Sequence, residues 1–152
     1  MQPPLTFATR ADKAQVEEGT SFAPKFDADG LIPAMAIDAA TREPLMLAYM
    51  NADSLRLTLA IGEAVYWSRS RKEIWHKGKT SGHTQKIIEI RTDCDQDALI
   101  LLVDQQGAGA CHTGRTTCFY RRVAAPDESG TPTLVHTQND LAFDPKKVYG
   151  GA

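Results

Sequence analysis

The sequence has no apolar stretch long enough to cross a bilayer. Its longest uninterrupted apolar run, residues 98–103, is far shorter than the roughly 20 residues that a membrane-spanning helix needs. The first residues, Met1-Gln2-Pro3-Pro4, lack the charged start and following apolar run that are typical of a secretory signal. We therefore expect a cytoplasmic protein that has no membrane partner.

Cysteine and net positive charge are also scarce. The chain has three cysteines, an odd number without any C-x-x-C pair, which argues against a secreted disulfide framework and against zinc-ribbon or thioredoxin patterns. The formal net charge is −2, so no overall positive field attracts nucleic acid or an anionic membrane. An anionic ligand must therefore be held by a local basic cluster.

What is present is the composition of an ordinary globular domain. The chain is 42% hydrophobic and 24% charged, and its 152 residues can bury a core without disulfides. We expect residues 1–25 to form an N-terminal arm and residues 26–125 to form the domain. Residues 126–152 are polar with proline and glycine, which predicts a C-terminal tail on the surface.

The predicted elements indicate an α+β fold. One helix is expected over residues 11–18, and another from Asn51 or Asp53 to Ile61. Pro33 indicates an edge or irregular position for its strand. Strands are expected over residues 31–37, 45–50, 65–67, 87–91, 98–103 and 119–123. Since the strands are not separated by regular helices and no repeat occurs, we predict a single compact domain with a mixed or antiparallel sheet and few helices.

The three cysteines are candidate metal ligands. Cys94, Cys111 and Cys118 all lie in the second half of the chain. Three thiolates can hold a tetrahedral Zn²⁺ and leave its fourth position open to water, which is the arrangement of catalytic zinc. A fourth protein ligand would instead close the site and indicate a structural or storage metal protein. The alternative is that the cysteines are scattered, small buried hydrophobes.

Three aspartates alternate around the first of these cysteines. If this segment is extended, the side chains of Asp93, Asp95 and Asp97 lie on one face and Cys94 lies on the other. Carboxylates so close together repel one another, and a hard cation such as Mg²⁺ would relieve the repulsion. A solvated turn between strands is the alternative. The D-x-D-x-D start resembles an EF-hand loop, but the required glycine is replaced by Ala98.

The segment between the last two cysteines adds a histidine and an arginine. His112 follows Cys111 directly, so it is a candidate general acid or base, or a fourth metal ligand. A solvated loop histidine is the alternative. Arg115, beside Gly114 and two threonines, suits a phosphate contact because a guanidinium binds phosphate at two points.

Residues 68–83 concentrate five lysine and arginine residues among hydroxyls, glycines and an aromatic side chain. This local positive charge predicts a phosphorylated ligand, on which Trp75 can stack a base. An exposed hairpin with solvated charges is one alternative, and an RNA-binding module is another. The candidate substrate contacts are Arg69, Ser70, Arg71, Lys72, Trp75, Lys77, Thr80, Ser81 and His83.

Together these segments resemble the phosphoribosyl-AMP cyclohydrolase family. The resemblance covers about residues 26–123 and is carried by residues 47–51, 68–75, 77–83, 93–97 and 111–121. His76, Lys79 and the pair Thr116-Thr117 depart from the commoner pattern, but none of these changes removes a candidate metal ligand.

The resemblance implies a function. Zinc-activated water would hydrolyse the N1–C6 bond in the adenine ring of 1-(5-phosphoribosyl)-AMP, giving the formimino-carboxamide ribotide of histidine biosynthesis. It implies one zinc per subunit, held by Cys94, Cys111 and Cys118 from both subunits of an intertwined homodimer. It also implies magnesium on Asp93, Asp95 and Asp97. His112 would move protons, and Arg69, Arg71, Lys72 and Arg115 would contact the two phosphates. No nucleic acid partner is expected.

Overall fold

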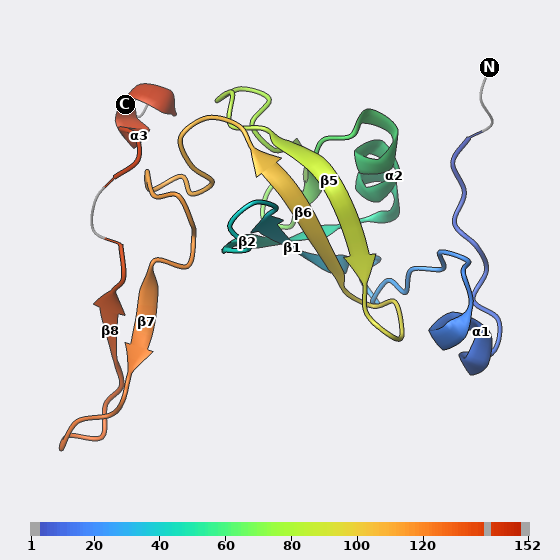
Figure 1. Cartoon of the computed structure of the whole chain (residues 1–152), viewed down its shortest axis with the longest axis horizontal. Helices are drawn as coiled ribbons and strands as arrows, with labels where there is room; N and C mark the ends of the chain where they lie inside the picture. Colours follow the sequence, from blue (N-terminus) through green and yellow to red (C-terminus); the bar gives the residue numbers. More distant parts are fainter. Residues whose placement is uncertain (1–3, 139–140, 150–152) are drawn as a thin grey trace.

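Six strands form one curved, mixed sheet in the order β4-β3-β2-β1-β6-β5 (Figure 1). The computed structural model describes residues 4–138 and 141–149. The strands of the sheet are β1 (Ile32–Asp38), β2 (Pro44–Met50), β3 (Val65–Ser68), β4 (Glu73–His76), β5 (Gln85–Thr92) and β6 (Leu99–Gln105). Strand β1 pairs parallel with β6, and the other neighbours pair antiparallel. The predicted α+β fold with a mixed sheet is therefore confirmed.

The remaining elements flank this sheet. Helix α2 packs beside β3, helix α1 lies in the N-terminal arm, and a two-stranded sheet of β7 and β8 extends away from the body (Figure 1). These elements are α1 (Lys13–Glu18), α2 (Ala52–Ile61), β7 (Arg121–Ala124), β8 (Thr133–His136) and α3 (Pro145–Val148). No helix within the described residues has the length and apolar character needed to cross a membrane.

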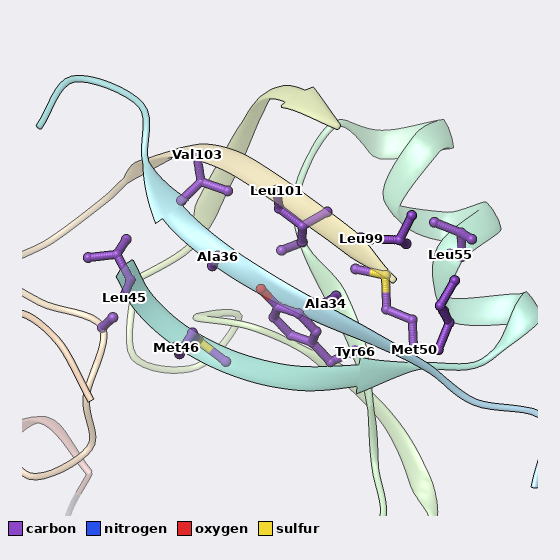
Figure 2. Packing of buried hydrophobic residues seen from close by; sticks show 13 residues of the cluster. Ala34, Ala36, Leu45, Met46, Met50, Leu55, Tyr66, Leu99, Leu101 and Val103 are labelled. Atoms are coloured by element: carbon purple, nitrogen blue, oxygen red, sulfur yellow. The ribbon is translucent and has the colours of Figure 1, made fainter. Parts of the chain in front are cut away.

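The core lies along β1 and its two neighbours. Alternate residues Ile32, Ala34 and Ala36 of β1 are fully buried, as the period of two in a strand predicts. All three belong to one hydrophobic cluster, in which Figure 2 shows Ala34 and Ala36 with Leu101 of β6 and Tyr66 of β3. The small alanines leave room for the tyrosine ring, so the largest buried side chain lies within the sheet's hydrophobic layer.

Helix α2 begins and ends at clear capping residues. The side chain of Asn51 accepts a hydrogen bond from the backbone N–H of Ser54, and the hydroxyl of Ser54 binds the backbone N–H of Asn51. Gly62 ends the helix with φ of +74°. Asn51 rather than Asp53 is therefore the cap. Leu55 is fully buried while Leu59 is exposed, so the two leucines do not share the buried face.

Three features of the strands differ from the predictions, and the first is that β4 is not among the strands expected from the sequence. Pro33 lies in β1, which is a central strand and not an edge. Pairing with β6 begins only at Ala34, so the missing N–H of Pro33 falls outside the parallel ladder. Strand β8 lies within the predicted C-terminal tail. All four of its residues are exposed, and hence no buried periodicity marked it as a strand.

The N-terminal arm is fastened to the body of the protein. Phe7 packs its ring against Phe22 and Phe26, with ring centroids 5.7 and 6.1 Å apart. Arg10 donates hydrogen bonds to the carbonyl oxygens of Ala23 and Asp95. The arm therefore contacts the turn that carries the three aspartates.

Candidate functional site

A cleft of about 270 Å³ lies where β4, the loop that follows it and the loop from Cys111 to Cys118 meet. It brings together residues that are more than 70 positions apart in the sequence. The lining residues are Met46, Arg71, Trp75, His76, Lys77, Gly78, Lys79, Thr80, Ser81, Ala110, His112, Cys118 and Tyr149. Seven of these are candidate site residues of the sequence analysis: Arg71, Trp75, Lys77, Thr80, Ser81, His112 and Cys118.

The loop over residues 77–83 forms one wall of the cleft. The backbone N–H of Lys77 donates to the carbonyl of Ala64, and that of Gly82 donates to the carbonyl of Gly78. Gly78 has φ of +81°, and a Cβ at this position would lie 2.2 Å from the carbonyl carbon of His83. Only glycine permits a turn this tight, so the sequence itself fixes the shape of this wall.

The loop from Cys111 to Cys118 forms the opposite wall. The backbone N–H of Cys111 donates to the carbonyl of Arg115, and that of Cys118 donates to the carbonyl of Leu45 at 2.7 Å. The hydroxyl of Thr117 also donates to the carbonyl of Pro44. The loop is thus tied to the start of β2, and both of its cysteines are held beside the cleft.

The sulfur atoms of Cys111 and Cys118 are neighbours. Burial, followed by the charge and hydrogen bond of Cys111, raises the pKa of the Cys118 thiol to about 12. A pair of neighbouring thiols is suited to a shared cation, because a bound metal displaces the thiol protons and neutralises the negative charge of the thiolates. Cys111 and Cys118 thus present two neighbouring thiols at and beside the cleft.

Lys77 is a buried, positively charged side chain that lines the cleft near these two cysteines. It is only 4% exposed, and its ammonium group lies 6.0 Å from the centre of the Trp75 ring. Burial lowers the pKa of Lys77, while the charges of Cys118 and Cys111 act in the opposite direction. A lysine so placed faces anionic groups in the cleft with little competition from water.

The two candidate histidines differ in position. His112 is exposed and lines the cleft. His83 is buried behind the loop, with its ring edge against Phe143 at a centroid distance of 4.6 Å. Burial and the charge of Lys77 lower the pKa of His83, and its Nδ1 has no hydrogen-bond partner among the described residues. Of these two histidines, His112 is therefore the one that lines the cleft, as His76 of β4 also does.

A second hollow of about 600 Å³ adjoins the cleft and shares Arg71 and Trp75 with it. Arg69 and Ser70 line this hollow, and the guanidinium of Arg69 lies 4.0 Å from the centre of the Tyr49 ring. The hairpin of β3 and β4 thus places basic side chains in both hollows. Trp75 lines both hollows.

Two predicted phosphate contacts lie outside both hollows. Lys72 is exposed at the tip of the β3–β4 hairpin, with φ of +53°. Arg115 packs its guanidinium over the Tyr120 ring at 4.2 Å and donates to the carbonyl of Gln138. In this chain, Arg115 thus holds the outside of the cysteine loop.

The turn between β5 and β6 lies at the other end of these strands from the loop that follows β6 (Figure 1), and its sequence contains Cys94 and the three aspartates. Cys94 precedes β6 and Cys111 follows it, so the length of that seven-residue strand, roughly 20 Å at about 3.3 Å per residue, lies between them. Residues 93–97 form a turn in which Gln96 has φ of +57°, so the segment is not extended and the alternative of a turn between strands describes its backbone. The ligand set of three thiols is therefore not gathered within one chain.

The turn nevertheless brings the three carboxylates together. One oxygen from each of Asp93, Asp95 and Asp97 lies within 4.8 Å of the others. Hydrogen bonds to Asp93 and Asp95 raise the pKa of Asp97. Oxygen ligands in this grouping suit a hard divalent cation.

Tyr149 is a cleft residue that the sequence analysis missed. It lies in the predicted polar tail, where no pattern in the residues marked it as part of a site. Met46 and Ala110 also line the cleft. They carry no reactive group, so only their position in the fold reveals them.

Comparison with known proteins gives one consistent result. The family model described as phosphoribosyl-AMP cyclohydrolase matches residues 46–120. The chain is 54% identical over 135 residues to a "Phosphoribosyl-AMP cyclohydrolase" of Rhodopseudomonas palustris strain CGA009, covering 89% of each protein. It is 55% identical over 139 residues to the protein of that name from Bradyrhizobium diazoefficiens, covering 91% of this chain and 97% of the relative.

Proposed function

The chain belongs to the phosphoribosyl-AMP cyclohydrolase family, and on this premise we propose that it hydrolyses the N1–C6 bond in the adenine ring of 1-(5-phosphoribosyl)-AMP. The resemblance found in the sequence is thereby confirmed at the level of the family. The observation that best supports the reaction is the cleft that joins Cys118, His112 and Lys77 to the hydroxyls of residues 80 and 81.

Binding of the substrate uses the cleft and the hollow beside it. The substrate carries a purine between two phosphorylated riboses, so it needs an aromatic surface flanked by two anion sites. Trp75 borders both hollows, while Arg69 lies in one and Lys77 in the other. We therefore assign the purine to the region of Trp75 and one phosphate to each side.

The donor set fits zinc when two chains are paired. Cys111 and Cys118 supply two neighbouring thiols at the cleft, and the third thiol, Cys94, would come from a second copy because its own chain holds it at the far end of the sheet. Sulfur ligands suit zinc. When bound, zinc acts as a Lewis acid that makes water a better nucleophile near neutral pH.

His112 is the residue that we assign to proton transfer. In the hydrolysis, a water oxygen bonds to C6, the bond from C6 to N1 breaks, and N1 receives a proton. His112 is exposed in the cleft and follows Cys111 directly, so its imidazole can reach both the water and the departing nitrogen. Lys77, held beside the two sulfurs, fixes a phosphate or balances negative charge in the same space.

Magnesium is assigned to the aspartate turn. The three carboxylate oxygens within 4.8 Å of one another fit a hard cation, and Asp93 also accepts hydrogen bonds from the backbone N–H groups of Asp97 and Ala98. If Cys94 of one chain meets the cleft of another, the aspartates beside it come with it. The metal would then lie near the substrate's phosphates.

The experiment measures turnover of phosphoribosyl-AMP together with zinc content per subunit. We expect one zinc per subunit, loss of turnover on chelation and its return when zinc is added. Cys111→Ser should lose both zinc and turnover, while Cys111→Ser and wild type should have similar circular dichroism. Turnover by zinc-free protein would contradict the metal assignment, and a zinc-loaded protein without turnover would contradict the reaction.

A further inference from the structure

The C-terminal segment returns to the cleft and places an aromatic hydroxyl in it. Tyr149, just after α3, lines the same cleft as Lys79, Thr80 and Ser81. Its side chain is 43% exposed, so one side of the ring faces solvent. Partial burial raises the pKa of Tyr149, and the neighbouring hydroxyl of Ser81 acts in the opposite direction. The tyrosine is therefore protonated near neutral pH and able to donate a hydrogen bond.

The C-terminal segment is anchored to the loop from Cys111 to Cys118. The carbonyl of Gly114 accepts hydrogen bonds from the backbone N–H groups of Ala142, at 2.6 Å, and Phe143, at 3.3 Å. A Cβ at Gly114 would lie 2.6 Å from the carbonyl oxygen of Phe143, and Gly114 has φ of +94°. The close approach of the two chain segments thus requires glycine at this position.

A second anchor lies on the opposite wall. The Phe143 ring meets the edge of the buried His83 ring at 4.6 Å, and Tyr149 lies 6.1 Å from the Phe143 ring. Asp144 caps α3 through the backbone N–H of Lys146, and Pro145 follows it at the first helical position. These contacts fix the direction in which α3 leaves Phe143, and so they fix where Tyr149 lies.

We propose that Tyr149 is a substrate-binding residue whose hydroxyl donates a hydrogen bond to a phosphate of the substrate, beside Lys79, Thr80 and Ser81. Lys79 offers an ammonium group, and Thr80 and Ser81 offer hydroxyls, and these are the groups that recognise phosphate. The Tyr149 hydroxyl adds a donor from the other side. The proposal rests on the proposed function, because it assigns a contact to the same substrate.

Kinetics of Tyr149→Phe give the first test. Removing one hydrogen bond to a charged oxygen should raise KM for phosphoribosyl-AMP about tenfold while kcat changes by less than about twofold. Lys147→Ala, an exposed change in α3 that does not line the cleft, is the matched control and should leave both constants unchanged. An unchanged KM in an active Tyr149→Phe protein would overturn the proposal. A fall in kcat that is accompanied by a loss of thermal stability would also overturn it, because that would indicate a structural role.

Binding titrations separate this proposal from the reaction itself. Tryptophan fluorescence, with Trp75 in the cleft, can follow the binding of AMP, ribose 5-phosphate and adenosine. Tyr149→Phe should weaken the binding of AMP, of ribose 5-phosphate or of both about tenfold and leave the binding of adenosine unchanged. Equal weakening of adenosine, or no weakening of either phosphate probe, would overturn the proposal. Wild-type protein without turnover would contradict the proposed function, and these titrations would still decide the role of Tyr149.

Discussion

At the scale of single residues, a buried polar chain supports the cleft. The hydroxyl of Tyr66 donates to the side chain of Gln85 at 2.6 Å, and Gln85 donates to Gln105. Gln105 in turn donates to the carbonyl of His83 at 3.0 Å, at the end of the cleft loop. Each side chain in this series has a hydrogen-bond partner, so the buried polar groups are satisfied and the cleft loop is held to the sheet.

Tyr66→Phe tests this chain. Removing the hydroxyl leaves the buried side-chain oxygen of Gln85 without its donor, so we expect a loss of about 1–3 kcal/mol in the free energy of unfolding. Urea denaturation at pH 7 measures it. The volume of the side chain hardly changes, so a loss well below this range would mean that Gln85 finds another partner.

The same tyrosine gives a pH dependence. Burial raises the pKa of Tyr66 well above its ordinary value of 10.0. Below about pH 10, Tyr66 is protonated in both the folded and unfolded states; above it, the unfolded state releases this proton and the folded state does not. Wild-type stability should therefore fall more steeply than that of Tyr66→Phe between about pH 9 and 11. Parallel slopes in denaturation series would contradict the assignment.

At the scale of elements, one amide connects the N-terminal arm to the aspartate turn. The buried side chain of Gln96 accepts a hydrogen bond from the backbone N–H of Ala23 and donates to the carbonyls of Val16 and Ser21. The arm and the turn are thus a single structural unit. The turn can hold its left-handed conformation at Gln96 because the arm covers it.

Gln96→Ala should release the arm. Three backbone groups lose their partner, which predicts a loss of about 1–3 kcal/mol in stability and faster tryptic cleavage after Arg10 and Lys13. Gln106→Ala is the matched control, because the exposed side chain of Gln106 donates to the carbonyl of Asp104 and not to the arm among the described residues. Equal cleavage rates in the two variants would show that Gln96 does not fasten the arm.

At the scale of the whole molecule, the separation of Cys94 from the cleft decides how the site can be assembled. Cys111 and Cys118 lie together at one end of β6, and Cys94 lies beyond the other end. A site with all three thiols therefore requires two chains. The intertwined homodimer remains a prediction, and it can be tested without a structure of the complex.

Mixing two inactive variants tests the shared site. After subunit exchange, equal amounts of Cys94→Ser and Cys111→Ser should recover about a quarter of wild-type activity, because half of the dimers are mixed and each has one intact site. The control is a mixture of Cys111→Ser with Cys118→Ser, which should recover none, since both changes affect the same side of every site. Equal recovery in the two mixtures, or none in either after confirmed exchange, would contradict sharing across subunits.

The sequence by itself determined the family, the fold class and most elements. Alternating burial in β1, the Asn51 cap and Gly62 end of α2, and the tight glycine turn at Gly78 all follow from local residue preferences. The residue types of the candidate site could also be read from the sequence, since the chemistry of thiols, carboxylates and basic groups depends on the residue type and not on its position in the fold.

Only the tertiary structure decided which of these groups share a space. It placed Pro33 in a central strand, kept Arg115 and Lys72 out of the cleft, and brought Tyr149 into it. It also separated Cys94 from the other two cysteines. These outcomes depend on pairing between distant strands and on the path of the returning chain. Such long-range contacts leave no period in the local sequence, so no reading of neighbouring residues could have supplied them.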